Sequence, residues 1–279
     1  MAFTCCANTK GEVEMSTAVA FASSSGIARA PADYRALAIF NRYLRVVPAN
    51  SEELLDQAYR LRFQVYCVER EFENAAEHPD GRECDRDDHR SLHSLLIDRA
   101  TNIAVGTVRL ILPRVGDDLP VFKISGSGER HGVKLPSQTT AEVSRFAIAK
   151  SFRRQRDNAW YPRAGASIAS CSHALTSQLL TFGLVHAVIS MSAYGGISHI
   201  VGILDPALLR LLGRLGVVFH PLGEPVAHHG VRQPGWAAMA NAIAGIKNRH
   251  PELGEIIDRT WAPTAGPSST APKISTLPN

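Results

Sequence analysis

The chain has 279 residues, of which 45% are hydrophobic and 20% are charged, and its formal net charge is +4. This size suggests one large or two small domains, and the composition is that of a soluble globular protein. Such a small charge excess, without a zinc-finger or RNA-binding signature, gives no reason to expect a nucleic-acid partner. The expected organisation is a disordered leader over 1–38, a folded domain over 39–262 and a disordered tail over 263–279.

The first predicted elements are a strand over 43–49, which Pro48 ends, and a helix that follows it. Asn50, with Glu53 three residues later, is typical of a capping box at the start of that helix. Apolar residues then recur at spacings of four and three and predict one buried stripe: Leu54, Ala58, Leu61, Val65 and Val68. Arg62 lies at the edge of this stripe, one turn before Tyr66.

After a polar loop, the pattern predicts three main strands, over 91–98, 103–112 and 141–149, with a short strand over 119–126 between the last two. The elements predicted after them are a helix over 164–183, a strand over 187–193, a helix over 205–216, strands over 217–223 and 225–233, and a helix over 235–250. The apolar region 179–204 is long enough to raise the question of a membrane span, but its histidines, glycines and serines favour a helix end, a strand and a loop.

This order of elements combines an antiparallel meander with αβ units and predicts an α/β (α+β) fold. We expect a central mixed sheet, mostly antiparallel, flanked by helices. The chain has neither of the glycine-rich motifs that bind nucleotide phosphates, so no nucleotide cradle is expected. The cysteines match no disulfide framework and no zinc ligand set, which favours free thiols in a reducing cytoplasm and no bound metal or cofactor.

Several charged residues lie where a sheet needs apolar ones. Arg109, in the strand 103–112, must either pair with carboxylates or reach solvent past the strand end. Glu142 and Arg145 are three residues apart and so lie on opposite faces of a regular strand, unless a bulge redirects one of them. A glutamate on an apolar strand has a raised pKa unless it is paired, which suits a general base; the alternative is a structural Glu–Arg pair.

The run Asp85, Asp87 and Asp88 is acidic, and a solvated loop is the usual structure of such a run. A metal site would need further ligands at suitable spacings, which the surrounding sequence does not supply.

The motifs that carry charge or aromatic rings have a recognisable order along the chain. They are "LRFQVY", "REF", "DRDD", "GTVRLILP", "PVF" and "EVSRF", which contain Arg62, Tyr66, Phe72, Asp85, Asp88, Arg109, Phe122, Glu142 and Arg145. This order resembles that of the acyl-homoserine-lactone autoinducer synthases and the N-acyl amino acid synthases, which share a GNAT-like acyltransferase fold. The chain departs from the family at Tyr66 and Phe72, where the family has phenylalanine and tryptophan.

The C-terminal half, over 208–236, looks like the acyltransferases that accompany PEP-CTERM/exosortase sorting systems. The resemblance implies an N-acyltransferase that moves a fatty acyl group from an acyl thioester, on acyl carrier protein or coenzyme A, to the amine of a small acceptor such as an amino acid. The thioester would be a co-substrate, with its phosphopantetheine between two parted strands. The alternative is a non-catalytic acyl-binding protein on the same fold.

The resemblance also implies roles for individual residues. Glu142 and Arg145 are the expected catalytic residues, with Glu142 as general base. The expected substrate-binding residues are Arg62, Tyr66, Phe72, Asp85, Asp88, Arg109 and Phe122. A basic loop suits the acidic acyl carrier protein, which we favour over coenzyme A, although a solvated loop is the alternative; its expected contact residues are Lys150, Arg153, Arg154 and Arg156. We expect a cytoplasmic protein without a nucleic-acid partner or a membrane span.

Overall fold

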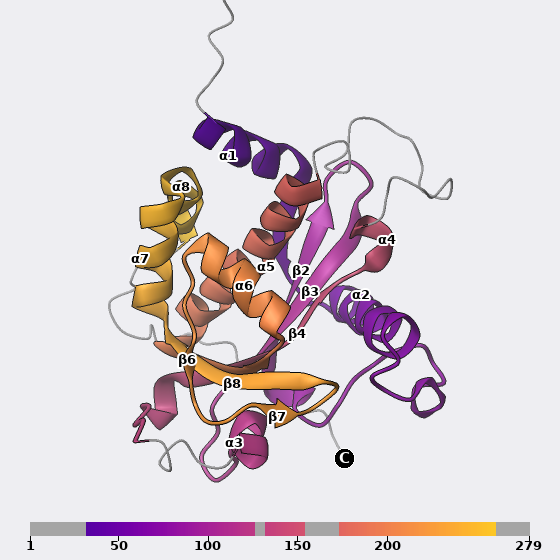
Figure 1. The fold of residues 1–279 in the computed structure, drawn as a ribbon. Helices are drawn as coiled ribbons and strands as arrows, with labels where there is room; N and C mark the ends of the chain where they lie inside the picture. The colour runs from indigo at the N-terminus through magenta and orange to yellow at the C-terminus, as the bar shows by residue number, and fades with distance from the viewer. Residues whose placement is uncertain (1–31, 126–131, 154–172, 261–279) are drawn as a thin grey trace, which may run out of the picture. The chain divides into compact units, whose positions relative to one another are not determined.

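The computed structural model describes residues 32–125, 132–153 and 173–260, and Figure 1 shows their arrangement. They form an eight-stranded sheet in the order β1-β2-β3-β4-β5-β8-β6, with β7 paired to β8. Every pair is antiparallel except β4 with β5, which are parallel. The predicted mixed, mostly antiparallel sheet is therefore confirmed.

The first described elements are α1 (Ala32–Tyr43), β1 (Leu44–Pro48) and α2 (Glu52–Phe63). α1 begins before the boundary that we expected between 38 and 39, and 263–279 lie outside the described residues. The N-cap of α2 is Ser51, not Asn50: its backbone is extended and its hydroxyl accepts a hydrogen bond from the Leu54 N–H at 3.3 Å. α2 continues as a π-helical turn, Gln64–Glu69, which carries Tyr66.

The predicted meander is confirmed as β2 (Ser91–Asp98), β3 (Ile103–Ile111) and β4 (Thr140–Ile148). The strand predicted over 119–126 is wrong, because Pro120–Ser125 form a short helix, α3. A proline is pre-organised for the first position of a helix, and Pro120 occupies that position. The last described residues of this region form α4 (Lys150–Arg153).

The prediction of a helix end and a separate strand before 195 is also wrong. Residues His173–Gly195 form one helix, α5, which is followed by β5 (His199–Leu204). Because α5 is apolar all round, it has no periodicity that distinguishes a helix from a buried strand. The stretch Leu175–Gly195 is long and apolar enough to cross a membrane, but 72% of its apolar window is buried inside the structure, as in a core helix.

The C-terminal part contains α6 (Pro206–Leu215), β6 (His220–Pro221), β7 (Val226–Ala227), β8 (Val231–Ala238), α7 (Met239–Arg249) and α8 (Pro251–Thr260). The two strands predicted over 217–223 and 225–233 do not pair with each other. β6 and β7 each pair with β8 instead, and β8 extends to Ala238. The helix predicted from 235 therefore begins only at Met239.

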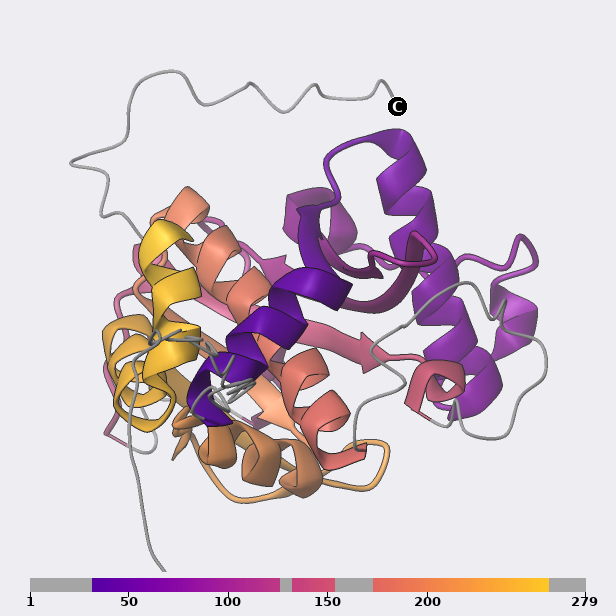
Figure 2. The same cartoon turned by 90° about the horizontal axis from the view of Figure 1, so that it is seen from above.

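Helices cover both faces of the sheet, as Figures 1 and 2 show. Alternate residues of β2 point to opposite faces. Leu96 packs into the core that α1, α5, α7 and α8 share, whereas Leu95 and Ile97 pack against α2. α2 and α5 therefore lie on opposite faces of the central strands, and β4 has a helix on each side of it.

Gly216 ends α6 in a left-handed conformation with a φ of 91°. A Cβ atom there would lie 2.2 Å from the carbonyl oxygen of Gly245. We expect Gly216→Ala to lower the free energy of unfolding by at least about 1–2 kcal/mol, the cost of the left-handed backbone alone. The measurement is urea unfolding at a fixed pH.

Gly213→Ala is the matched control, because Gly213 is inside α6 and has nothing within 4 Å of the new methyl group. It should raise the free energy of unfolding by about 0.5–1 kcal/mol. Equal effects of the two substitutions would contradict the close approach of Gly216 to Gly245.

Candidate active site

β4 and β5 separate in the middle of the sheet. They pair only over three positions, from Thr140 with His199 to Glu142 with Val201. Beyond Glu142 both strands continue unpaired with each other, and a pocket of about 470 Å³ is lined by residues of both. Glu142 is thus the last residue of β4 that pairs with β5 and lies at the point where these two strands part.

The pocket has one polar and one apolar part. Charged and aromatic residues from the π-helical turn and the loop after α2, and from β3, β4 and β8, line the first part: Tyr66, Arg70, Phe72, Glu73, Asp85, Asp87, Arg109, Glu142, Arg145 and Arg232. Apolar residues of α5, α6 and α7 line the second, among them Val185, Val188, Leu208, Leu212, Met239 and Ala242. A continuous space therefore connects the charged residues in front of the sheet to its apolar interior.

Glu142 is a buried carboxyl group at the junction of these two parts. Burial raises its pKa to about 7, although a hydrogen bond from the Val121 N–H at 2.8 Å and the nearby Arg109 act in the opposite direction. The raised pKa that the apolar strand predicted is therefore confirmed. A carboxyl group with this pKa can accept and release a proton near neutral pH, as a general base must.

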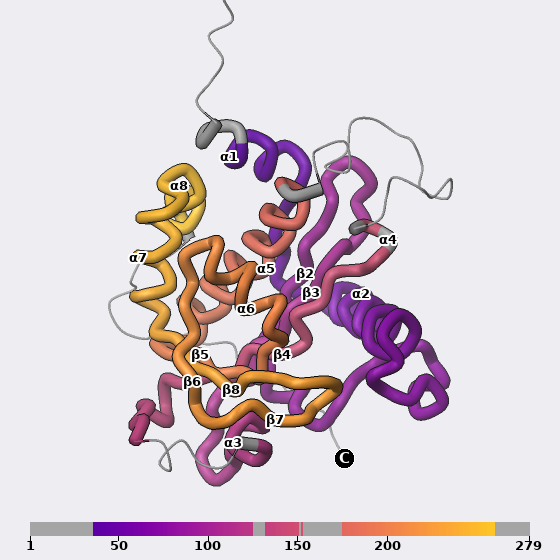
Figure 3. The backbone as a smooth tube through the Cα atoms, in the orientation of Figure 1, coloured from indigo at the N-terminus to yellow at the C-terminus, as the bar shows by residue number. Residues whose placement is uncertain are grey.

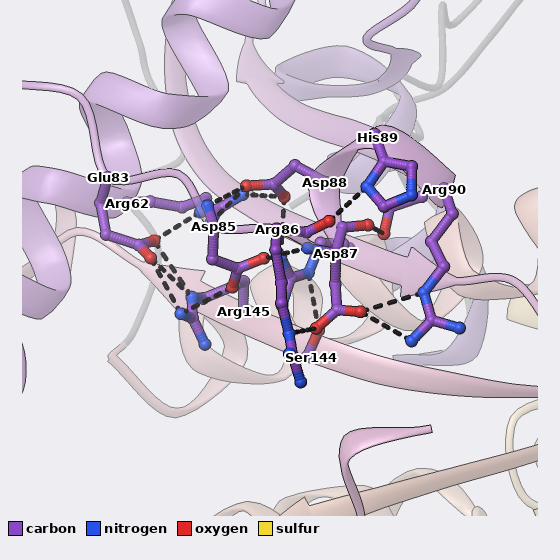
Figure 4. A network of polar contacts seen from close by, with 12 residues as sticks. Arg62, Glu83, Asp85, Arg86, Asp87, Asp88, His89, Arg90, Ser144 and Arg145 are labelled. Atoms are coloured by element: carbon purple, nitrogen blue, oxygen red, sulfur yellow. Dashed lines mark hydrogen bonds and ion pairs between the residues drawn. The ribbon is translucent and has the colours of Figure 1, made fainter. Parts of the chain in front are cut away.

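Arg145 is redirected by an irregularity in β4. Its φ is 50°, and the pairing of β3 with β4 shifts register between Thr107 and Arg109. Its Nη2 atom lies 2.8 Å from Glu83 Oε1 and 3.1 Å from Asp85 Oδ2, as Figure 4 shows. Among the two arrangements that the sequence allowed, the bulge is confirmed, and Arg145 pairs with these acids rather than with Glu142.

Three arginines and three carboxylates form one ion-pair network in front of β3 and β4. Arg62 is fully buried and donates to Glu83 Oε2 at 2.6 Å and to Asp88 Oδ1 at 2.6 Å. Arg109 Nη1 lies 2.6 Å from Asp85 Oδ1 and 2.7 Å from Asp88 Oδ1. The prediction that carboxylates pair with Arg109 is therefore confirmed.

The network fixes the charge of its acids. Burial by itself would raise the pKa of Glu83, but hydrogen bonds from Arg145 and Arg62 lower it to about 2. The pKa of Asp88 is likewise held well below its usual range by Arg62 and Arg109 despite its burial. All three carboxylates remain ionised near neutral pH, so the network has no net charge and Glu142 is the group that titrates.

The acidic run is not a solvated loop. Asp88 is inside the network, and Asp87 accepts hydrogen bonds from Arg90 at 2.6 and 3.0 Å (Figure 4). The sequence expectation fails for Asp85 and Asp88 because the arginines that neutralise them come from α2, β3 and β4, which local composition does not reveal, whereas Asp87 pairs with Arg90 of the same segment.

The structure brings most, but not all, of the expected site residues to the pocket. Those that line it are Tyr66, Phe72, Asp85, Arg109, Glu142 and Arg145. Arg62 and Asp88 lie behind them and hold Arg109 and Glu83 in place. Phe122 does not line the pocket; it packs beside Ile111, Val201 and Leu222 in a separate apolar cluster.

Sequence reasoning missed Glu83, which is 1% exposed and joins Arg62 to Arg145. Its only signal is its place two residues before Asp85, within a loop that we interpreted as solvated. Glu73 and Arg232, the residue of β8 that lines the pocket, were also missed, since nothing in their local sequence distinguishes them from surface residues.

Aromatic rings and guanidinium groups alternate along the polar part of the pocket. The Arg145 guanidinium lies 5.3 Å from the centre of the Tyr66 ring. The guanidinium groups of Arg70 and Arg232 each lie 5.6 Å from the centre of the Phe72 ring. These contacts orient the rings of Tyr66 and Phe72, which the resemblance implies as substrate-binding residues.

The basic loop is only partly described. The Lys150 N–H donates to the Glu69 carboxylate at 2.9 and 3.0 Å, and its ammonium group contacts the Glu69 carbonyl oxygen. Only the backbone of Arg153 is described, and Arg154 and Arg156 lie outside the described residues. The carrier-protein surface therefore stays a prediction, and Lys150 already has partners within the chain.

Two further observations concern metals and thiols. In the part of the chain that the structure describes, no group of three or more His, Cys, Asp or Glu side chains is placed to hold a metal ion. The described cysteines, Cys67 and Cys84, are free thiols.

The comparisons with known proteins point to one fold. Residues 61–160 match the model of a family described as the acetyltransferase (GNAT) domain. No curated protein matches the sequence. The structure of TofI in a ternary complex with an inhibitor and MTA is similar to this chain with a TM-score of 0.52 and 19% identity, over 75% of this chain and 98% of TofI.

Two other solved structures are similar. BjaI, a CoA-dependent acyl-homoserine lactone synthase with SAM and isopentyl-CoA, has a TM-score of 0.51 and 20% identity, over 76% of this chain and 89% of its own. FeeM, an N-acyl amino acid synthase from uncultured soil microbes, has a TM-score of 0.46 and 13% identity, over 72% and 93%. At these identities, TofI and BjaI show a likeness of fold.

The fold is therefore GNAT-like, as the sequence predicted. The region that matches the acetyltransferase family includes Arg62, Glu83, Arg109, Glu142 and Arg145, so it contains the ion-pair network and the candidate base. The family match and the fold together indicate that this chain is an acyltransferase.

Proposed function

We propose that the protein transfers a fatty acyl group from an acyl thioester to the amine of a small acceptor such as an amino acid, with Glu142 as general base. One observation carries the proposal: a single pocket connects Glu142 and the charged network to an apolar space between the sheet and α5, α6 and α7. The buried carboxyl group suits proton transfer, and the apolar lining suits a hydrocarbon chain.

In this proposal the acceptor enters as an ammonium ion and loses a proton to Glu142, directly or through one water molecule. The free amine attacks the thioester carbonyl carbon and the new C–N bond forms. As the C–S bond breaks, the nitrogen gives up its second proton, which neutralises the leaving thiolate, and Glu142 then releases the first proton to solvent. Backbone N–H groups beside the parted strands stabilise the oxyanion that forms between these steps. Arg109 and Arg145, already neutralised by Asp85, Asp88 and Glu83, orient the acceptor.

The parting of β4 and β5 supports the proposed path of the donor. A phosphopantetheine arm can lie between the two strands and bring its thioester next to Glu142, with the acyl chain inside the apolar part. BjaI is CoA-dependent by its description. For this chain we propose acyl carrier protein as donor, because residues 150–163 include several arginines and the carrier is acidic.

The proposal also covers the domain boundaries, the cellular location and the system in which the protein acts. We propose a folded acyltransferase domain that begins with α1, earlier than the expected residue 39, and extends to 262, with a leader before it and a tail over 263–279 after it. We also propose that it is located in the cytoplasm, where acyl thioesters are made. The resemblance of 208–236 supports a role beside PEP-CTERM/exosortase systems. Fractionation of cells and the gene neighbourhood test these two points independently of catalysis.

The direct test follows thiol release from acyl carrier protein or coenzyme A thioesters of graded chain length, with a panel of amines. Release that depends on one class of amine, with an N-acyl product seen by mass spectrometry, supports the proposal. Binding of the acyl chain without release for any amine would instead support a non-catalytic acyl-binding protein. Comparable kcat/KM values for the two thioesters would contradict the preference for the carrier protein.

The apolar part of the pocket should set the acyl-chain length. Ala242 in α7 lines it and is buried. Ala242→Leu should lower kcat/KM for the longest accepted acyl chain by about 10- to 200-fold, the range for one misfitting apolar group, and should spare shorter chains. Ala244→Leu is the control, because Ala244 is exposed on the same helix. A uniform loss over all chain lengths would contradict the assignment of this part to the acyl chain.

A further inference from the structure

A hairpin from the C-terminal part of the chain reaches the polar part of the pocket. β7 and β8 pair Val226 with Arg232 and Ala227 with Val231, and residues 228–230 form the turn between them. Figure 3 shows this hairpin extending towards the segment that follows α2. His228, His229 and Arg232 line the pocket together with Tyr66 and Phe72, which come from the other end of the sequence.

His229 has an unfavourable backbone conformation. Its φ is 51°, in the left-handed region, which costs a residue with a Cβ atom free energy that glycine does not lose. Residues of this kind persist where their surroundings fix them, and they concentrate at ligand-binding sites. A glycine at this position would relieve the strain, so the histidine side chain is the feature that needs an explanation.

The surroundings fix the turn through Arg232. Its Nη2 atom donates to the His229 carbonyl oxygen at 3.1 Å and its Nε atom to the His228 carbonyl oxygen at 3.2 Å. Its Nη1 atom lies 2.7 Å from Asp205 Oδ2, and Asp205 is itself the N-cap of α6. The turn is thus connected to the beginning of α6, which lines the same pocket.

The His229 ring is held against the residues that follow α2. It stacks on the Phe72 ring, with 4.9 Å between the ring centres and 20° between the ring planes. Its Nε2 atom lies 4.0 Å from Glu73 Oε1, and Glu73 in turn lies 3.8 Å from Arg145 Nη2. The ring therefore completes an aromatic wall with Phe72 and Tyr66 in the polar part of the pocket.

We propose that His229 is a specificity-determining residue for the acceptor. Its ring, with Phe72 and Tyr66, forms the wall against which the side group of the acceptor packs, while Arg232 is the positioning residue that fixes the turn. The assignment rests on the proposed function, because an amine that gives its proton to Glu142 must lie in the polar part of the pocket. The acyl chain lies in the apolar part and does not reach this wall.

The test uses His229→Gly and His229→Asn, since both residues tolerate a left-handed backbone and neither carries a ring. Thiol release from one fixed acyl thioester is measured against α-amino acids of graded side-chain size. We expect kcat/KM for the preferred amino acid to fall about tenfold, through a higher KM, which is the size of a lost aromatic contact. The kcat/KM values for amino acids with different side chains should become more similar to one another. The KM for the thioester should not change. The urea midpoint of His229→Gly should not fall, because glycine relieves the backbone strain.

His220→Ala is the matched control, because His220 is an exposed histidine whose ring lies 4.9 Å from the Trp236 ring, at a tilt of 35°, and does not line the pocket. It should leave acceptor selectivity unchanged, and His229→Phe should restore part of it. Wild-type selectivity in His229→Gly, or equal changes in both KM values, would overturn the assignment. Wild-type protein that releases no thiol with any amine would overturn the proposed function and this assignment with it.

Discussion

Glu142→Gln should lower kcat by about 10²- to 10⁴-fold, the usual contribution of a positioned general base. The amide is close in shape to the carboxyl group, and its oxygen can still accept the hydrogen bond from the Val121 N–H. The loss should therefore reflect proton transfer and not a disturbed strand. Steady-state thiol release at saturating thioester and amine measures it.

The pH dependence should identify the same group. Because burial raises the pKa of Glu142 to about 7, wild-type kcat/KM should fall about tenfold per pH unit below that value as the base becomes protonated. The residual activity of Glu142→Gln should lack this dependence. A wild-type profile without an inflection near pH 7, or nearly normal turnover of Glu142→Gln, would show that Glu142 is not the base.

The pH dependence of the free energy of unfolding tests the raised pKa of Glu142 without any measurement of activity. Between its ordinary pKa of 4.5 and about 7, Glu142 holds a proton in the native state that the unfolded chain has released. Wild-type stability should therefore fall as pH rises through this window, by on the order of 3 kcal/mol. Glu142→Gln cannot titrate, so it should not show this part of the fall and should be at least as stable as the wild type at pH 8.

Arg62→Met should lower the free energy of unfolding by about 3–5 kcal/mol, the usual effect of removing one partner from a buried ion pair. Arg62 is fully buried and donates to Glu83 and Asp88, which lose these donors while they remain buried. Methionine fills similar space without the charge, so the effect is electrostatic and not a large cavity. Urea unfolding at pH 7 measures it.

Arg60→Met, in the same helix, is the matched control. The Arg60 side chain is 58% exposed and pairs with Asp56 four residues earlier, an arrangement that contributes about 0.3–0.5 kcal/mol. Adding Asp88→Asn to Arg62→Met should recover part of the lost stability, because the remaining two arginines then face two carboxylates, with Arg109 paired to Asp85 and Arg145 to Glu83. A loss in Arg62→Met as small as that in Arg60→Met would mean that the network does not hold this region together.

Much of the fold could be predicted because its signals are local. The apolar stripe of α2, the apolar runs of β2, β3 and β4, and the capped, proline-initiated α6 each depend on neighbours within one or two turns or strands. The same reasoning gave two alternatives each for Arg109 and Glu142, and the structure has Arg109 paired with carboxylates and Glu142 buried with a raised pKa. In both cases the cost of burying a charge limits the possibilities: a buried charged group must be paired or become neutral, whichever residue is its partner.

The errors share a cause as well. α5 was divided into a helix and a strand because a helix that is buried on all sides has no polar face to reveal its period. The short α3 was predicted as a strand because four or five apolar residues satisfy either pattern. Phe122 lies in α3 and packs in a separate apolar cluster. It therefore lies outside the pocket, although the order of motifs predicted that it binds substrate.

The sequence by itself determined which segments are amphipathic, and it identified Arg109 and Glu142 as ionisable groups on apolar strands whose burial requires a partner or, for Glu142, a raised pKa, because these properties depend on a residue and its near neighbours. Only the tertiary structure decided that Glu83 joins Arg62 to Arg145, that β4 and β5 part beside Glu142, and that His229 stacks on Phe72. Those contacts join segments far apart in the chain, and their geometry is set by the packing of the whole sheet against its helices rather than by any local pattern.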